Sequence, residues 1–497
     1  MSNHLIDALK AGSADREDAV FAELPDGATL SFGAFFEGAA RFGGALREAG
    51  VAPGDRVAVQ VAKTIEALQL YVGTVMAGAI YLPLNTGYTS NELTHFITDA
   101  GPSLFICDSG SEADIAARAP CPVWTLDAEG AGTAAERMGD ATAIEPVARK
   151  ADNLAAILYT SGTTGSPKGA MLSHGNLASN SQTLAALWRF TSDDVLIHAL
   201  PVFHTHGLFV ATNVALMSGA SILFHPGFDA EAVLKDMPRA TALMGVPTFY
   251  TRLLQQDGLA EAAHTMRLFV SGSAPLLAET HDRWAAVTGH RILERYGMTE
   301  TNMNTSNPYD GERRAGTVGF PLPGVDLRLT DGKGARVASG EPGIVEVRGP
   351  NVFQGYWNLP EKTAEELLPD GFFVTGDIGR IDEDGYLHII GRAKDLVISG
   401  GYNVYPKEVE LLIDACEGVS ESAVIGVPHP DFGEAVVAVV VPDGPTTPEA
   451  IMTAIAPDLA RYKQPKSVIL VEGLPRNAMG KVQKNVLRDA FAELFAP

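Results

Sequence analysis

AAILYTSGTTGSPKG, residues 155–169, combines a short apolar run with a loop rich in glycine and hydroxyl side chains. An apolar run of this length that ends in turn residues is typical of a strand buried in a parallel sheet. The glycines let backbone N–H groups approach an anion, while the hydroxyls and Lys168 add donors and a positive charge. Lys168 is followed by Gly169 rather than by serine or threonine, so the loop is not the common P-loop. The stretch predicts a loop that grips phosphate at the end of a strand.

Strand and helix patterns alternate over most of the chain around this stretch. Similar apolar runs predict buried strands at 55–61, 103–108, 220–226, 242–247 and 267–273, and residues 31–50 have helical apolar spacing. Such alternation predicts an α/β fold with layers of mostly parallel sheet covered by helices. After about residue 315 the pattern predicts a smaller β-rich section, and residues 395–497 are expected to form a small α+β domain.

The composition excludes several classes of protein. The chain has 497 residues, with 37 Lys and Arg against 60 Asp and Glu and a formal charge of −23. Such acidity argues against a nucleic-acid partner and against an anionic membrane surface. Glycines and Pro83 interrupt the uncharged residues 67–91, which predicts a buried helix running into a strand and no membrane span. Three scattered cysteines and an N-terminus without a secretory signal fit a reducing cytoplasm.

Several later strings, together with the loop, resemble the motifs of the adenylate-forming superfamily in their order and spacing. This superfamily includes acyl-CoA synthetases, firefly-type luciferases and peptide-synthetase adenylation domains. RLFVSGSAPL (267–276) resembles its adenine-side segment, and ERYGMTE (294–300) resembles the segment that holds the acyl-adenylate and the metal. The ribose-contact and hinge segments of the superfamily resemble FFVTGDIG (372–379) and GRAKDLVISGGYNVYPKEVE (391–410). The loop with the catalytic lysine resembles PRNAMGKVQK (475–484). The resemblance covers essentially the whole chain.

The resemblance implies an AMP-forming ligase that uses ATP, Mg²⁺ and CoA. An acid would attack the α-phosphorus of ATP to form an acyl-adenylate, and a thiol would then displace AMP, which requires charge neutralisation and in-line placement. Glu300 with help from Thr164 is expected to hold Mg²⁺, and Lys481 to supply positive charge at the reacting carboxylate and α-phosphate. The residues expected to bind the nucleotide or adenylate are Thr160, Ser161, Gly162, Thr163, Thr164, Gly165, Lys168, Ser273, Ala274, Pro275, Glu294, Arg295, Tyr296, Gly297, Met298, Thr299, Asp377 and Arg392.

The resemblance also implies a division between an ATP- and acid-binding domain, residues 1–393, and a mobile C-terminal domain, residues 394–497. Lys394 aligns with the hinge position, and Gly400, Gly401 and Tyr402 would face CoA after the domain turns. Lys481 is a candidate for acetylation by a protein acetyltransferase, because acetylation would remove its charge.

Three further strings suggest which acid is activated. Malonate-activating members of the family have segments that resemble three strings of this chain. These strings are LPVFHTHGLFV (200–210), MGVPTFYTRLL (244–254) and LERYGMTETNMNTSNPY (293–309). A dicarboxylate needs a cation for its second carboxylate, and guanidinium matches that group through two parallel hydrogen bonds. Arg252 and Arg295 are the candidate partners, and His206 is a candidate donor to the substrate. Malonate is therefore the expected acid, with methylmalonate as a second substrate.

Several alternatives stay open from the sequence alone. Either arginine could instead be solvated or paired internally, as most arginines are. The acid could be another short-chain carboxylic acid. A P-loop-like kinase or NTPase is an alternative of a different class, although it would release ADP instead of AMP. A non-catalytic ATP-binding sensor is a further alternative. The charged run PEKTAEELLPDG, residues 360–371, is interpreted as a solvated helix.

Overall fold

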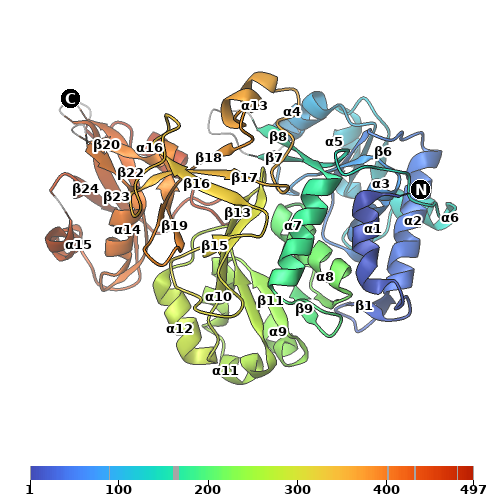
Figure 1. Ribbon diagram of the computed structural model, residues 1–497, viewed down its shortest axis with the longest axis horizontal. Coiled ribbons are helices and arrows are strands. Elements are labelled where there is room, and N and C mark those ends of the chain that lie inside the picture. Colours follow the sequence, from blue (N-terminus) through green and yellow to red (C-terminus); the bar gives the residue numbers. More distant parts are fainter. Residues whose placement is uncertain are drawn as a thin grey trace. The chain divides into compact units, whose positions relative to one another are not determined.

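The computed structural model describes residues 2–88, 90–160, 167–399, 402–429, 432–459, 461–477 and 480–495 (Figure 1). The chain divides into two compact units. Unit 1 consists of Met1–Asp326 and Val347–Phe373, and unit 2 consists of Leu327–Glu346 and Val374–Pro497. This division reflects compactness, so the predicted hinge boundary at 393/394 stays a prediction.

A six-stranded sheet in unit 1 carries the glycine-rich stretch. Its strand order is β6-β5-β3-β4-β7-β8, with parallel pairing throughout except for the antiparallel β7 and β8. The predicted strands at 55–61, 103–108 and 155–161 are confirmed as β3, β5 and β7. The strands are β3 (Arg56–Gln60), β4 (Ile80–Pro83), β5 (Leu104–Cys107), β6 (Val123–Thr125), β7 (Leu154–Thr160) and β8 (Lys168–Ser173).

A nine-stranded sheet in unit 1 has the order β15-β14-β13-β12-β11-β9-β10-β1-β2. The six strands from β13 to β1 pair in parallel, so their carboxyl ends meet at one edge, where ligands bind in sheets of this kind. The strands are β1 (Val20–Glu23), β2 (Thr29–Ser31), β9 (Val195–His198), β10 (Ser221–Phe224), β11 (Ala242–Gly245), β12 (Leu268–Ser271), β13 (Leu293–Met298), β14 (Asn302–Ser306) and β15 (Phe320–Pro321).

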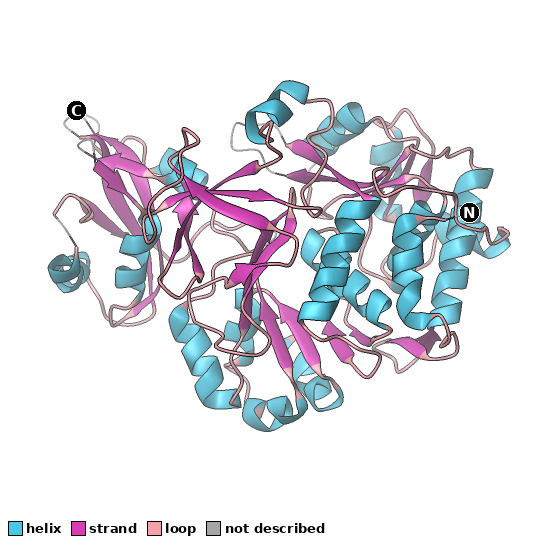
Figure 2. Ribbon diagram, viewed as in Figure 1, coloured by secondary structure: helices cyan, strands magenta, loops and turns pink. Residues whose placement is uncertain are grey.

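Helices of unit 1 pack against one another in a layer, shown in cyan in Figure 2. They are α1 (His4–Lys10), α2 (Phe32–Glu48), α3 (Ile65–Met76), α7 (His174–Leu187) and α8 (Asn213–Ser218). The uncharged segment at 67–91 begins as the buried helix α3 and continues into β4, as predicted. Among the helices within the described ranges, none has the length and apolar character needed to cross a bilayer. The remaining helices of unit 1 are α4 (Ser90–Ala100), α5 (Glu112–Ala116), α6 (Thr133–Asp140), α9 (Ala230–Asp236), α10 (Pro247–Leu253), α11 (Leu259–Ala262), α12 (Ala278–Thr288) and α13 (Pro360–Glu366).

Unit 2 has the predicted mixture of β-rich and α+β structure. Most of a four-stranded sheet, β16-β17-β18-β19, belongs to it, together with a mainly antiparallel five-stranded sheet in which β24 pairs with β23. Buried valines on β22 and β23 pack against α14 and α15 to form its core. The elements are β16 (Asp326–Thr330), β17 (Gly343–Arg348), β18 (Phe373–Ile381), β19 (Leu387–Arg392), β20 (Val397–Ser399), β21 (Tyr402–Val404), β22 (Val419–His429), β23 (Gly433–Pro442), β24 (Ser467–Leu470), α14 (Pro406–Asp414), α15 (Pro448–Ile455) and α16 (Lys484–Ala490).

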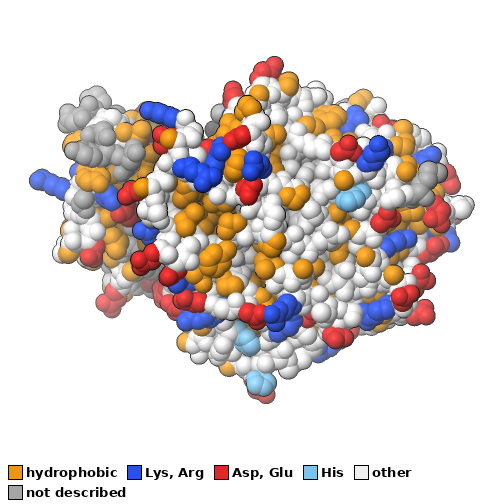
Figure 3. Space-filling view, in the orientation of Figure 1, with side chains coloured by type: hydrophobic (Ala, Val, Ile, Leu, Met, Phe, Trp, Pro, Cys, Tyr) orange, Lys and Arg blue, Asp and Glu red, His pale blue; other side chains and the backbone are white. Residues whose placement is uncertain are grey.

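The predicted fold class is confirmed: layered, mostly parallel sheets with helices, followed by β-rich and α+β structure. Acidic and basic side chains lie interspersed over the face that Figure 3 shows.

Candidate active site

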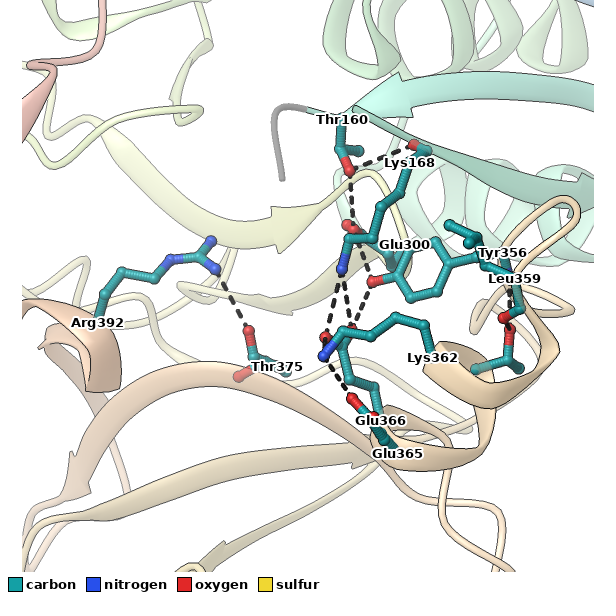
Figure 4. A network of polar contacts seen from close by, with 11 residues as sticks. Thr160, Lys168, Glu300, Tyr356, Leu359, Lys362, Glu365, Glu366, Thr375 and Arg392 are labelled. Atoms are coloured by element: carbon teal, nitrogen blue, oxygen red, sulfur yellow. Dashed lines mark hydrogen bonds and ion pairs between the residues drawn. The ribbon is translucent and has the colours of Figure 1, made fainter. Parts of the chain in front are cut away.

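The two strands that flank the glycine-rich loop bring Thr160 and Lys168 side by side. They are paired residues in the antiparallel register of β7 and β8. The Thr160 hydroxyl donates to Oε1 of Glu300 at 3.3 Å, and Glu300 is only 5% exposed. Ser161, Gly162, Thr163, Thr164 and Gly165 lie outside the described residues. The structure thus gathers three of the predicted phosphate and metal residues at the base of this loop (Figure 4).

Tyr356 joins these residues, although the sequence analysis did not identify it. Its hydroxyl lies 3.1 Å from Oε1 of Glu300 and 2.6 Å from Oε2 of Glu366, and both carboxylates can accept from it. The ammonium group of Lys168 lies 4.0 Å from the centre of the Tyr356 ring. Lys168 also forms an ion pair with Glu366 at 3.3 Å. Glu366 belongs to α13, so the helix interpreted as merely solvated contributes to this network.

Glu300 suits a magnesium ion that binds together with nucleotide. Mg²⁺ prefers oxygen ligands and is usually held by one or two carboxylates plus substrate phosphates. Glu300 supplies one buried carboxylate beside the predicted phosphate loop. Within the described ranges, no group of three or more His, Cys, Asp or Glu side chains is arranged to hold a metal ion. A site completed by phosphate oxygens fits this chain better than a site made of protein ligands alone.

A buried guanidinium lies at the carboxyl edge of the nine-stranded sheet. Arg295 on β13 is 4% exposed, and its Nε and Nη2 atoms have no hydrogen-bond partner among the residues that the structure describes. Burial lowers the pKa of Arg295 to about 9, which expresses the cost of holding this charge without a counter-ion. A Cβ atom at Gly272 would lie 2.4 Å from the guanidinium carbon. Gly272, which the sequence analysis also missed, therefore provides the space that Arg295 occupies.

His206 and Ser273 lie close to this guanidinium. Nδ1 of His206 is 3.2 Å from the Ser273 hydroxyl, and Ser273 has a left-handed backbone with φ of 71°. Burial and then the positive charge of Arg295 lower the pKa of His206 well below its ordinary value, so the ring is neutral. Nε2 of His206 has no partner within the described ranges, and it carries the ring proton in the tautomer in which Nδ1 accepts from Ser273. Arg295 and His206 thus offer unused donors to an anionic group.

The backbone that carries His206 has an uncommon form. His206–Thr212 is a π-helical segment that begins at this histidine and continues into α8. His198 lies beneath it, with Nε2 3.1 Å from the Gly207 carbonyl oxygen and 3.0 Å from the Thr212 hydroxyl. Short π-helical segments inside helices are often found at functional sites. Here the segment begins at His206, a residue of the candidate site.

The structure also shows where the side chains of two other predicted residues lie. The Arg252 side chain is exposed on α10, whereas Phe249, Tyr250 and Leu253 are buried. Two positions along a helix correspond to a turn of about 200°, so Arg252 lies opposite the inward-facing Tyr250. The side chain of Glu294 is likewise engaged inside unit 1, bonded to His281 Nδ1 and to the Gly316 N–H, each at 3.2 Å.

The other predicted residues near the sheet edge are partly accessible. Gly297 permits the close β13–β14 hairpin, because a Cβ atom there would lie 1.9 Å from the Asn302 carbonyl oxygen. Half-buried positions are Ser273, Ala274, Tyr296, Gly297, Met298 and Thr299, while Pro275 is exposed.

Unit 2 positions a carboxylate and a guanidinium as a pair. Asp377 on β18 lies opposite Arg392 on β19 in the antiparallel register, and Nε of Arg392 is 2.6 Å from Oδ1 of Asp377. Asp377 is 4% exposed, and its N–H donates to the Thr375 hydroxyl at 3.1 Å. Arg392 therefore orients the carboxylate that is predicted to bind ribose.

Lys481 is held in a tight loop of unit 2. Its N–H donates to the Asn477 side chain at 2.9 Å, and its carbonyl oxygen accepts from the Asn477 N–H at the same distance. Desolvation, and then the positive charge of Arg392, lowers the pKa of Lys481, while the Asp377 carboxylate opposes this shift. Lys394 lies in the short helical turn Ala393–Asp395, and desolvation is the main cause of its lowered pKa.

The predicted CoA-facing residues are only partly described. Gly400 and Gly401 lie outside the described residues, and Tyr402 is the first residue of β21, with its backbone described but not its side chain.

Comparison with known proteins places this arrangement in a family context. The model of the AMP-binding enzyme family matches residues 9–357, and that of the AMP-binding enzyme C-terminal domain matches residues 408–481. ATP-bound MatB from Rhodopseudomonas palustris superposes with a TM-score of 0.97 and 55% sequence identity, over 100% of both chains.

Two curated relatives differ in the acid that their names give. A malonate–CoA ligase from Arabidopsis thaliana is 36% identical over 478 residues, which cover 88% of this chain and 78% of the relative. A feruloyl-CoA synthase from an Amycolatopsis species is also 36% identical, over 94% of each chain. Overall similarity at this level therefore does not distinguish the acids, and the lining of the site must do so.

Proposed function

The chain belongs to the AMP-binding enzyme family, and on that premise we propose that it is an AMP-forming ligase that converts malonate, ATP and CoA to malonyl-CoA, AMP and pyrophosphate. The buried guanidinium of Arg295 carries the proposal. A buried cation without a counter-ion is costly, and a carboxylate that is not consumed in the reaction would supply that counter-ion. A monocarboxylic acid would leave the charge unpaired. Malonate has the required second carboxylate.

In the proposed first half-reaction, one malonate carboxylate attacks the α-phosphorus of ATP and pyrophosphate leaves. Arg295 and the Nε2–H of His206 bind the other carboxylate, which fixes the orientation of the acid. Thr160 and Lys168 bind the β- and γ-phosphates, together with the hydroxyls of Ser161, Thr163 and Thr164. Asp377 binds the ribose. Glu300, with Thr164, holds Mg²⁺, which supplies positive charge at the phosphates when bound. Lys481 adds positive charge at the carboxylate and α-phosphate, where the transition state is most anionic.

In the proposed second half-reaction, the CoA thiol attacks the acyl carbonyl carbon and AMP leaves. Lys481 is needed at the adenylate only in the first half-reaction. We propose that residues 394–497 act as a mobile domain that turns about Lys394 and brings Gly400, Gly401 and Tyr402 to CoA. The short turn Ala393–Asp395 at the end of β19 supports this assignment, because hinge residues usually lie at the ends of elements.

Product analysis tests the proposed function. Purified protein is incubated with ATP, Mg²⁺ and CoA, and separately with malonate, methylmalonate, succinate, acetate and propionate. We expect AMP and malonyl-CoA, with methylmalonate also used, because an added methyl group changes binding by only about 1–3 kcal/mol. Acetate should be used about 10⁴-fold less efficiently, because it leaves the donors of Arg295 unpaired. AMP formation with acetate but not with malonate would favour another short acid, and ADP formation would favour a kinase.

The hinge proposal predicts that Lys394→Pro separates the two half-reactions. Proline fixes φ and removes an N–H, so it should restrict the backbone change at this position. We expect malonate-dependent exchange of pyrophosphate with ATP to stay within about threefold of wild type, and thioester formation to fall at least about 100-fold. Lys394→Ala, which leaves the backbone free to turn, is the matched control. Loss of both half-reactions in Lys394→Pro would contradict the hinge assignment.

We further propose that a protein acetyltransferase can regulate the enzyme at Lys481. The Lys481 side chain is exposed, so a modifying enzyme can reach it. Acetylation would remove the charge needed for adenylation. Protein acetylated at Lys481 should lose malonyl-adenylate formation and regain it after deacetylation; adenylation at the normal rate would contradict the proposal.

The cytoplasm is the compartment that we propose for this reaction. The three cysteines are free, and Cys107 is buried. Free cysteines of this kind fit a reducing compartment, in which ATP and CoA are also supplied. Localisation of a tagged chain by fractionation tests this assignment.

A further inference from the structure

The phosphate-loop lysine already has an anionic partner within the chain. The ammonium group of Lys168 lies 3.3 Å from Oε1 and 3.4 Å from Oε2 of Glu366 and rests over the Tyr356 ring (Figure 4). The side chains of Lys168 and Glu366 are 13% and 22% exposed, so water screens this pair only in part. Lys168 is thus held by a carboxylate and an aromatic face.

This contact conflicts with the role that Lys168 has in the proposed function. An ammonium group has three donors, and two of the short contacts of Lys168 are to the oxygens of Glu366. A bound triphosphate would need the same donors and the same charge. ATP must therefore compete with Glu366 for Lys168.

The chain provides Glu366 with replacement partners. Lys362, one turn earlier on α13, lies 3.0 Å from Oε1 of Glu366, and the Tyr356 hydroxyl lies 2.6 Å from Oε2. Burial acts to raise the pKa of Glu366, but the hydrogen bonds from Tyr356 and Lys362 and the nearby lysine charges outweigh it and lower the pKa. Tyr356 and Lys362 therefore keep Glu366 partnered when Lys168 turns to phosphate, which keeps the cost of the exchange small.

We propose that Glu366 is a competing counter-ion that sets the affinity for ATP through Lys168, and that Lys362 weakens this competition by sharing the carboxylate. This inference rests on the proposed function, because it requires Lys168 to bind ATP phosphates. It assigns opposite effects to two neighbouring charges on one short helix. Removing Glu366 frees Lys168 for ATP, whereas removing Lys362 leaves Glu366 more dependent on Lys168.

The test measures binding of MgATP to the full chain by calorimetry, without acid or CoA. Glu366→Gln should lower the Kd for ATP by about two- to fivefold, and Lys362→Gln should raise it by about two- to fivefold, as expected for partly exposed ion pairs. In the double variant the Lys362→Gln effect should disappear, because no carboxylate remains to be shared. Glu361→Gln removes the same charge from an exposed position of α13 and should leave the Kd unchanged.

AMP serves as a second ligand that separates this effect from a structural one. AMP has no β- or γ-phosphate, so its Kd should change by less than about twofold in every variant, and a general distortion of the site would move both ligands. A higher Kd for ATP in Glu366→Gln would overturn the inference, because Glu366 would then position Lys168 for ATP. Unchanged ATP binding in both single variants would overturn it too. Failure of the wild-type chain to bind ATP would instead refute the proposed function.

Discussion

Replacing Arg295 by glutamine should lower kcat/KM for malonate by about 10³-fold, because truncating one partner of a buried charge pair costs about 2–5 kcal/mol or more. The activity with acetate should stay within about threefold of its low wild-type value, since acetate has no second carboxylate. The variant should also unfold at the same temperature as the wild type or higher. Arg295 is buried with unpartnered nitrogens among the described residues, so its removal relieves a cost that the ligand-free chain bears.

Two further variants show whether charge or geometry matters at this position. Arg295→Lys keeps the charge but loses the planar pair of donors, so it should recover only part of the malonate activity. Gly272→Ala keeps the arginine but adds a methyl group 2.4 Å from its guanidinium carbon, which must then move. We expect kcat/KM for malonate to fall by about 10-fold or more. Equal losses for malonate and acetate in Arg295→Gln would contradict the assignment of the second carboxylate.

Replacing Lys481 by alanine should lower the rate of malonyl-adenylate formation by about 10³-fold, the effect of removing one preorganised donor from an anionic transition state. The rate of thioester formation from prepared malonyl-adenylate and CoA should stay within a few-fold of the wild-type rate, because pyrophosphate has already left. Pyrophosphate exchange and single-turnover thioester formation measure the two steps separately. Lys333→Ala, an exposed lysine in unit 2, is the matched control. Equal loss of both steps in Lys481→Ala would contradict its assignment to adenylation.

The sequence predicts the fold well because its strands are short apolar runs with clear boundaries. The strands at 242–247 and 267–273 appear in the structure as β11 and β12, and the helix at 31–50 appears as α2. Parallel strands buried on both faces have nearly continuous apolar sequences. Each such strand can therefore be recognised from its own sequence, without knowing which strand pairs with it. The sequence pattern does not show which strands share a sheet.

The site was less predictable, because the direction of each side chain depends on tertiary packing. The sequence makes both Arg252 and Arg295 candidates for the second carboxylate, but Arg252 lies on the outer side of a helix and Arg295 on a buried strand. Glu366 stands in a run of charges that is typical of a solvated helix, and α13 indeed has no buried residue. Only the placement of α13 beside β8 shows that Glu366 contacts Lys168.

The π-helical form of His206–Thr212 makes the direction of the His206 side chain sensitive to the number of residues in this segment. A π-turn contains one residue more than an α-turn. Deleting a single residue from this segment would restore ordinary helical spacing and rotate the residues before it by about 100° relative to those after it. His206 would then point away from Arg295, with every side chain of the site unchanged in identity. Relatives that activate different acids could therefore differ by one deletion at this place, a change that a comparison of aligned site residues would overlook.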